Sequence, residues 1–124
     1  MIEALFNQPN YLAAKKTLDA VALRQQAIAT NIANLETPGY KRVDLSPSFQ
    51  QQLERAAGTG DVQSLASLKP TLAVDATAVA SKDGNSVNLE KELMQQNQNA
   101  MTNGYETQLI SGLLAKLRLA IAGK

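Results

Sequence analysis

Apolar residues recur at alternating spacings of three and four near both ends of the chain, which is the pattern of a helix that packs along one seam. The second seam needs a helix about 50 Å long, more than a domain of this size requires. Two such seams predict that the ends of the chain pair with each other, with neighbouring copies, or with both. The seam positions are Tyr11, Ala14, Leu18, Val21, Gln25, Ile28, Ile32 and Leu35 in the first helix, and Leu89, Leu93, Gln96, Ala100, Asn103, Thr107, Ile110, Leu114, Leu117 and Ile121 in the second.

The first helix has clear limits in the sequence. Residues 1–8 read as a lead-in, Pro9 can open the helix, and neither Gly nor Pro interrupts residues 11–34. The following segment, Thr37-Pro38-Gly39-Tyr40, fits a type II turn. Pro presets the first central position of such a turn, and Gly supplies the positive φ of the second. The sequence therefore predicts a sharp exit from the first helix.

The second helix is predicted to begin after Asn88, which fits an N-cap. Glu90 and Glu92 follow in the first turn, where carboxylates favour the positive end of the helix dipole. Gly104 and Gly112 oppose the helix, because each costs roughly 1 kcal/mol relative to Ala. Packing partners must therefore supply much of its stability.

The middle of the chain, residues 41–86, differs in character from both ends. Ser46 fits the N-cap of a short helix whose face is Phe49, Leu53 and Ala57, and residues 58–60 end it. Residues 61–68 predict a further helical turn or two, residues 71–77 an extended segment, and residues 82–86 a turn. This middle segment could be flexible, or it could be a small subdomain inserted between the long helices.

The pattern as a whole predicts a mainly α protein. Long N- and C-terminal helices pair as an extended coiled-coil-like hairpin, with a small, partly irregular or flexible middle segment. The three parts are residues 1–40, with the first helix and its turn, 41–86, and 87–124, with the second helix.

Composition supports helix seams and argues against several functions. Aromatic residues make up 4% of the chain and Trp is absent, so the apolar residues are mainly Leu, Ala, Ile and Val. These suit helix packing better than a thick core. The net charge is +1 with both signs interspersed, which gives no field to hold nucleic acid or an anionic membrane. No run approaches the roughly 20 apolar residues that cross a bilayer.

The chemistry of catalysis and metal binding is poorly represented. The chain has no Cys and no His, which removes disulfides, thiolate metal sites and the commonest general base. Residues 83–90 carry oxygen ligands without the spacing of a calcium loop, so a turn followed by a helix cap is the better interpretation. No nucleophile, phosphate loop or cofactor motif is present. We therefore expect no enzyme, metal or cofactor.

Two stretches resemble a known family. Residues 31–41, Asn-Ile-Ala-Asn-Leu-Glu-Thr-Pro-Gly-Tyr-Lys, resemble the NIAN-x-x-TPGYK signature of bacterial flagellar rod and hook proteins. Residues 83–92, Asp-Gly-Asn-Ser-Val-Asn-Leu-Glu-Lys-Glu, resemble the DGN-x-V-x-x-E-x-E segment that opens the C-terminal helix in the proximal-rod branch. Glu36 and Asn88 are mild departures, since Asp is common at both positions.

The resemblance implies a structural subunit of the flagellar basal body. Such proteins pair their terminal helices as the inner layer of a helical tube that transmits motor torque. They leave the cell unfolded through the flagellar type III export apparatus, which agrees with an N-terminus that has Glu3 where a signal peptide has bases. The implied location is the rod within the periplasm. The implied partners are other copies, the rod proteins FlgC, FlgF and FlgG, the adaptor FliE, and the flagellar base with its export gate.

Two sets of residues are expected to carry this role. The turn signature should fix the exit from the first helix, with its Asn side chains bonding backbone groups, and the seam should pack subunits. The alternatives are a cytoplasmic helical export chaperone or adaptor and a self-contained helical-bundle regulator. The signature residues are Asn31, Asn34, Thr37, Pro38, Gly39, Tyr40, Asp83, Gly84 and Asn85, and the subunit-packing seam is Leu18, Val21, Ile28, Ile32, Leu89, Leu93, Ile110, Leu114, Leu117 and Ile121.

Overall fold

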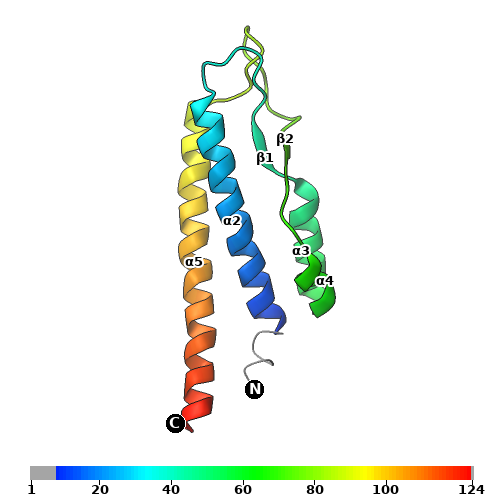
Figure 1. Ribbon diagram of the computed structural model, residues 1–124, viewed down its shortest axis with the longest axis vertical. Helices are drawn as coiled ribbons and strands as arrows, with labels where there is room; N and C mark the ends of the chain where they lie inside the picture. The colour runs from blue at the N-terminus through cyan, green and yellow to red at the C-terminus, as the bar shows by residue number, and fades with distance from the viewer. Residues whose placement is uncertain (1–7, 124) are drawn as a thin grey trace.

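A computed structural model describes residues 8–123, so most of the expected lead-in, together with residue 124, lies outside the described residues. Two long helices, α2 and α5, run side by side as an antiparallel hairpin, and a thin layer of short elements covers the other side of α2 (Figure 1). The mainly α fold with paired terminal helices is confirmed. The elements are α2 (Pro9–Ala33), β1 (Val43–Leu45), α3 (Pro47–Thr59), α4 (Val62–Ser67), β2 (Leu72–Val74) and α5 (Leu89–Ala122).

The limits of both long helices agree with the sequence. Pro9 occupies the first turn of α2, and Asn88 caps α5 by accepting a hydrogen bond from the backbone N–H of Lys91 at 3.2 Å. Both interior glycines of α5 remain helical. The C-terminal turns of α5 extend beyond the first turn of α2 (Figure 1).

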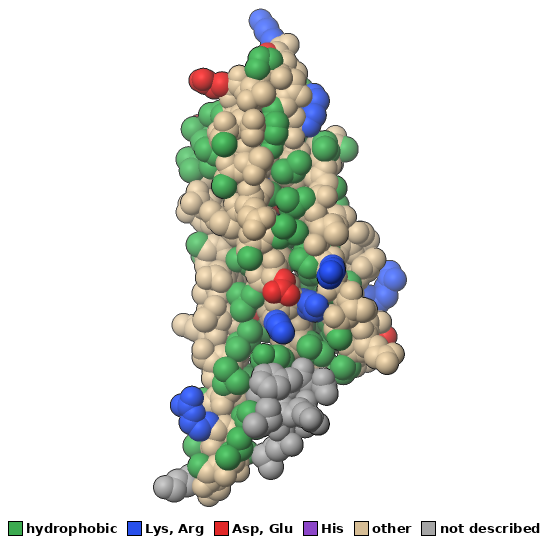
Figure 2. All heavy atoms as spheres, in the orientation of Figure 1, with side chains coloured by type: hydrophobic (Ala, Val, Ile, Leu, Met, Phe, Trp, Pro, Cys, Tyr) green, Lys and Arg blue, Asp and Glu red, His purple; other side chains and the backbone are tan. Residues whose placement is uncertain are grey.

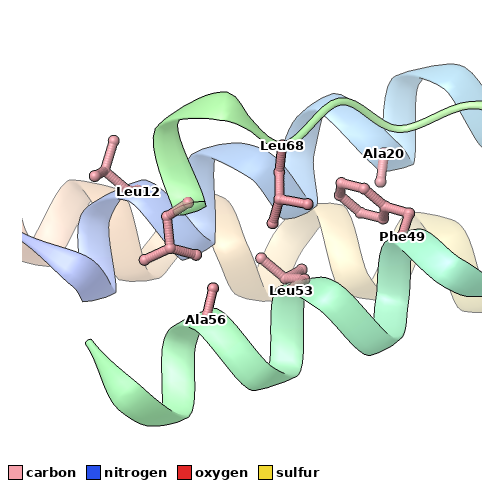
Figure 3. Packing of buried hydrophobic residues seen from close by; sticks show 7 residues of the cluster. Leu12, Ala20, Phe49, Leu53, Ala56 and Leu68 are labelled. Carbon is pink, nitrogen blue, oxygen red and sulfur yellow. The ribbon is translucent and has the colours of Figure 1, made fainter. Parts of the chain in front are cut away.

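The middle segment folds into a small subdomain on α2. One buried apolar cluster joins α2, α3 and α4, and Figure 3 shows its side chains pointing toward one another between the helices. The predicted face of α3 needs one correction, since Ala56 is buried and Ala57 is exposed. Spacings of four and then three from Phe49 keep Ala56 on the packed side of the helix. The cluster consists of Leu12, Ala20, Phe49, Leu53, Ala56, Leu65 and Leu68.

A two-stranded antiparallel sheet closes the middle segment. Asp44 of β1 lies opposite Ala73 of β2, within the stretch that the sequence predicted to be extended. The sequence did not predict β1, because three residues are too short to show a strand alternation. The sheet returns the chain from α4 toward the start of α5 and so places residues 75–92 beside the exit from α2.

Candidate assembly site

The two signature stretches lie against each other at the closed end of the hairpin. The predicted turn is present, since the Tyr40 N–H donates to the Thr37 carbonyl at 3.2 Å and Gly39 has a φ of +75°. The Gly39 N–H donates to the Asp83 carbonyl at 2.9 Å. A Cβ on Gly84, whose φ is +85°, would lie 3.3 Å from the Gly39 Cα. Glycine is therefore required by conformation at both positions and by close approach at Gly84.

Asn85 caps the end of α2 from across the chain. Its Nδ2 lies 2.8 Å from the Asn34 carbonyl, 3.1 Å from that of Leu35 and 2.8 Å from that of Thr37. Its Oδ1 accepts from the Val87 N–H at 2.7 Å. Carbonyls beyond the last turn of a helix lack intrahelical partners. The second signature stretch thus supplies a further donor to the carbonyls of the first, of which those of Asn34 and Thr37 also accept backbone hydrogen bonds.

Asn31 is fully buried and uses all of its hydrogen-bonding capacity. Its Nδ2 donates to the Val43 carbonyl at 2.8 Å and to the Glu92 carboxylate at 3.3 Å. Its Oδ1 accepts from the Val43 N–H at 2.9 Å and from the Tyr40 hydroxyl at 3.0 Å. An amide offers two donors and two acceptors. Asn31 therefore links α2, β1, the turn and α5 through one side chain.

Arg42 is 8% exposed and is surrounded by carboxylates from three parts of the chain. Its Nε donates to Glu92 at 2.7 Å, and its guanidinium also pairs with Asp75 at 2.5 Å and Asp44 at 3.4 Å. Glu92 is completely buried. We call Asn31, Tyr40, Arg42, Asp75, Asn85 and Glu92 the polar junction.

The electrostatics of the polar junction favour the charged forms of Arg42 and Asp75 and the neutral form of Tyr40. Burial lowers the pKa of Arg42, but hydrogen bonds to Glu92 and Asp75 outweigh this effect and the net pKa is raised. Hydrogen bonds from Thr77, and then from Arg42, lower the pKa of Asp75 against its desolvation. Burial, followed by the charge of Glu92, raises the pKa of Tyr40. The ion pair between Arg42 and Asp75 therefore persists at neutral pH.

The polar junction is built for structure rather than for chemistry. Within residues 8–123, every buried side-chain nitrogen and oxygen has a hydrogen-bond partner. Over the same residues, no group of three or more acidic, His or Cys side chains is placed to hold a metal ion. The described helices also include none long and apolar enough to cross a membrane. The arrangement can lock the end of α2 to the start of α5.

The other signature residues act locally. The Asn34 side chain donates to the Thr30 carbonyl at 2.8 Å and accepts from the Thr37 hydroxyl at 3.1 Å, while Pro38 is exposed in the turn. Sequence reasoning missed Arg42 and assigned Glu92 only to the helix dipole. Their pairing spans fifty residues and leaves no local pattern.

α5 is inverted relative to an ordinary amphipathic helix. Its buried residues are Glu92 and Asn99, both polar, and the Asn99 amide donates to the Val21 carbonyl of α2 at 2.9 Å. Half-buried Thr102 and Glu106 continue this face. At its start, the predicted seam is offset by one position in the sequence from this buried face. The offset places the seam about 100° around the helix axis from the face.

The seam residues therefore lie in two environments. On α2, Ile28 is buried, and Leu18, Val21 and Ile32 are half-buried. On α5, Ile110 and Leu117 are half-buried, and the remaining seam leucines and isoleucine stay exposed in the free subunit. These exposed residues are Leu89, Leu93, Leu114 and Ile121.

Comparisons with known proteins agree with this architecture. A family described as flagella basal body rod protein matches residues 12–41, which include most of α2 and the turn. The chain is 31% identical to the flagellar basal body rod protein FlgB of Borrelia hermsii, covering 71% of this chain and 77% of that protein. It is 30% identical to FlgB of Borreliella burgdorferi, covering 68% and 74%.

These similarities extend well beyond the short signature and favour a rod subunit over a chaperone. Rod proteins of the flagellar basal body form a structural class and not an enzyme class. The chain therefore belongs to the FlgB family of flagellar basal body rod proteins and has a structural role in the rod.

Proposed function

We propose that this chain is a proximal-rod subunit that assembles helically through α2 and α5 and transmits motor torque. The observation that supports this most strongly is the inverted surface of α5. Nine large apolar side chains of this helix are exposed, although monomeric proteins rarely expose large contiguous apolar patches. They are Leu89, Leu93, Met94, Met101, Tyr105, Leu109, Leu114, Leu119 and Ile121.

Charge supports the same role for α5. Between residues 93 and 115 the only charged residue is Glu106, so about 35 Å of helix carries almost no charge. On the face shown in Figure 2, the α5 side carries mainly hydrophobic and uncharged side chains between an acidic residue near the top and a basic one near the bottom. Such a surface lacks the charges that keep a free helix soluble, and neighbouring subunits would cover it.

The seam and the polar junction have complementary roles in this proposal. The seam residues become buried where neighbouring copies meet. This contact is heterologous, because it joins two different surfaces, and it generates an open helical assembly rather than a closed ring. The polar junction fixes α2 to α5 within each copy, so that load applied to one helix reaches the other. Torque would then pass through packed helices and not through loops.

Export in an unfolded state is part of the proposal. The free subunit has one small apolar cluster, and its polar junction closes only when residues 31–42 meet residues 75–92. Absence of Cys spares the chain thiol chemistry during passage into the periplasm. FlgC, FlgF, FlgG, FliE and the export gate are the proposed partners beyond other copies of the chain.

Leu114→Asp tests the assembly seam. Leu114 is 38% exposed in the free subunit, so the substitution should leave export nearly intact while the buried charge abolishes rod assembly. The measurement is a mass-spectrometric count of the chain in purified basal bodies, the secreted fraction and the cytoplasm. Leu114→Met is the control, since its similar volume should preserve assembly.

Two outcomes would oppose the proposal. Normal rods built from Leu114→Asp would show that the seam assignment is wrong. A wild-type chain absent from basal bodies, but found in the cytoplasm bound to exported subunits, would support the chaperone instead.

A further inference from the structure

A groove of about 650 Å³ opens between the first half of α2 and the second half of α5. Its α2 side is made of small side chains, with Ala13, Ala14 and Thr17, and its α5 side carries Glu106, Leu109 and Leu113. Small residues let another backbone approach closely. The groove has a mixed lining, with small side chains on α2 and two leucines among polar groups on α5, and it suits a further helix that carries both apolar and charged residues.

Glu106 is the unusual residue of this groove. It is half-buried, and no ion pair joins it to another described residue, so its carboxylate oxygens keep contact with solvent. Desolvation raises its pKa, with no opposing charge to lower it. Lys116 also lines the groove, but it lies about 15 Å away along the helix axis. A carboxylate in this position is best stabilised by a cation brought from outside.

The C-terminal turns of α5 carry a matching surface. Leu114, Arg118 and Ile121 follow spacings of four and three, so they share one face of the helix. Leu114 and Ile121 are 38% and 58% exposed, and Arg118 is exposed without an ion-pair partner in the described chain. Arginine suits a partly desolvated ion pair, because its guanidinium is weakly hydrated and binds carboxylates in a fixed geometry.

We propose that the C-terminal turns of α5 in one copy dock into this groove of a neighbouring copy, pairing Arg118 with Glu106 while Ile121 packs on Leu109. This inference rests on the proposed assembly of copies through their helices. The contact joins two different surfaces and so propagates without closing. For parallel helices, the twelve-residue separation sets a stagger of about 18 Å between neighbours.

Thiol cross-linking tests the contact directly, because the chain has no cysteine of its own. Basal bodies containing the doubly substituted chain Glu106→Cys/Arg118→Cys are isolated, treated with a short bismaleimide that spans the length of the replaced side chains, and separated on a denaturing gel. A ladder of linked multimers is expected, with no ladder from either single variant. Glu90→Cys combined with Glu106→Cys is the matched control, and it should give no ladder.

Charge exchange provides the second test. Glu106→Arg and Arg118→Glu should each lower the amount of chain in basal bodies by about tenfold or more, because each places like charges together. Combining the two substitutions should restore most of the loss.

The outcomes separate the two proposals. Basal bodies that contain the cysteine pair but yield no ladder, or normal incorporation of Glu106→Arg, would overturn the docking contact while leaving the rod function intact. Absence of the wild-type chain from basal bodies would instead overturn the rod function itself.

Discussion

Gly39 and Gly84 have backbone conformations that other residues adopt only with strain. Both have positive φ, and the two residues approach each other closely where the signature stretches meet. The positive φ therefore explains why residue 39 is glycine. At residue 84, the positive φ and the close approach to Gly39 both explain it. Sequence reasoning predicted the conformation of Gly39 from its turn, but the approach of Gly84 to Gly39 needed the tertiary structure.

Gly39→Val should destabilise the free subunit by about 1–3 kcal/mol, because a β-branched residue is strained at a φ of +75°. A Cβ at this position meets nothing within 4 Å, so the effect comes from backbone strain rather than from a clash. Urea unfolding followed by circular dichroism measures the loss.

Glu36→Gln is the neighbouring control for this turn. Glu36 is exposed, so its substitution should change stability by less than about 0.5 kcal/mol. Equal stability of the two variants would refute the role assigned to the turn.

At the scale of single elements, α5 shows the clearest departure from ordinary packing. In its first half polar residues face α2 and large apolar residues are exposed, whereas in its second half Ile110, Leu113 and Leu117 are half-buried. Helix periodicity identified two seams but could not decide which contacts are intramolecular, since adjacent positions differ by about 100° around the helix. The division of the chain at residues 40 and 86 stays a prediction.

Glu106→Gln should stabilise the free subunit at pH 7 by a fraction of a kcal/mol. Desolvation raises the folded-state pKa of Glu106, so its contribution to stability is full below the unfolded pKa and is lost as pH rises through the folded pKa. The ionised carboxylate of Glu106 therefore opposes folding at neutral pH. The effect on stability is small because the side chain is partly exposed to solvent. Thermal unfolding of both chains between pH 3 and pH 8 should show the gain at neutral pH and none at pH 3.

An equal gain at both pH values would mean that ionisation of Glu106 is not the cause. Glu90→Gln, on the exposed first turn of α5, serves as a control for removal of a carboxylate as such. The same Glu106→Gln change should weaken incorporation into rods if the proposed pair with Arg118 forms.

For the whole molecule, the polar junction is the feature that unites the terminal regions with the middle segment. Asn31 and Arg42 reach Glu92 over sequence separations of 61 and 50 residues, and Asp75 joins them from the end of the sheet. A buried ion pair is weak evidence of net stability, but loss of one partner is costly. The junction therefore favours one relative placement of the helices.

Glu92→Gln should destabilise the free subunit by about 1–3 kcal/mol. The substitution removes the carboxylate charge that compensates the buried Arg42. It also weakens the hydrogen bond from the Asn31 amide, because the new side chain offers that amide either an NH₂ donor or a neutral oxygen, which is a weaker acceptor. Equilibrium unfolding of the full chain measures the effect, and Glu90→Gln should change it by less than about 0.5 kcal/mol. Matching effects of the two substitutions would show that the junction contributes nothing beyond surface charge.

The sequence alone determined the features that depend on neighbouring residues. Helix limits, the type II turn, the Asn88 cap and the mainly α class follow from local propensity and periodicity, and the two signature stretches indicated the family. The tertiary structure decided which distant groups meet. It brought Asn31, Arg42 and Glu92 into one buried network, closed Gly84 against Gly39, and turned the polar face of α5 toward α2. These contacts join segments more than forty residues apart or depend on helix rotation, and local sequence constrains neither.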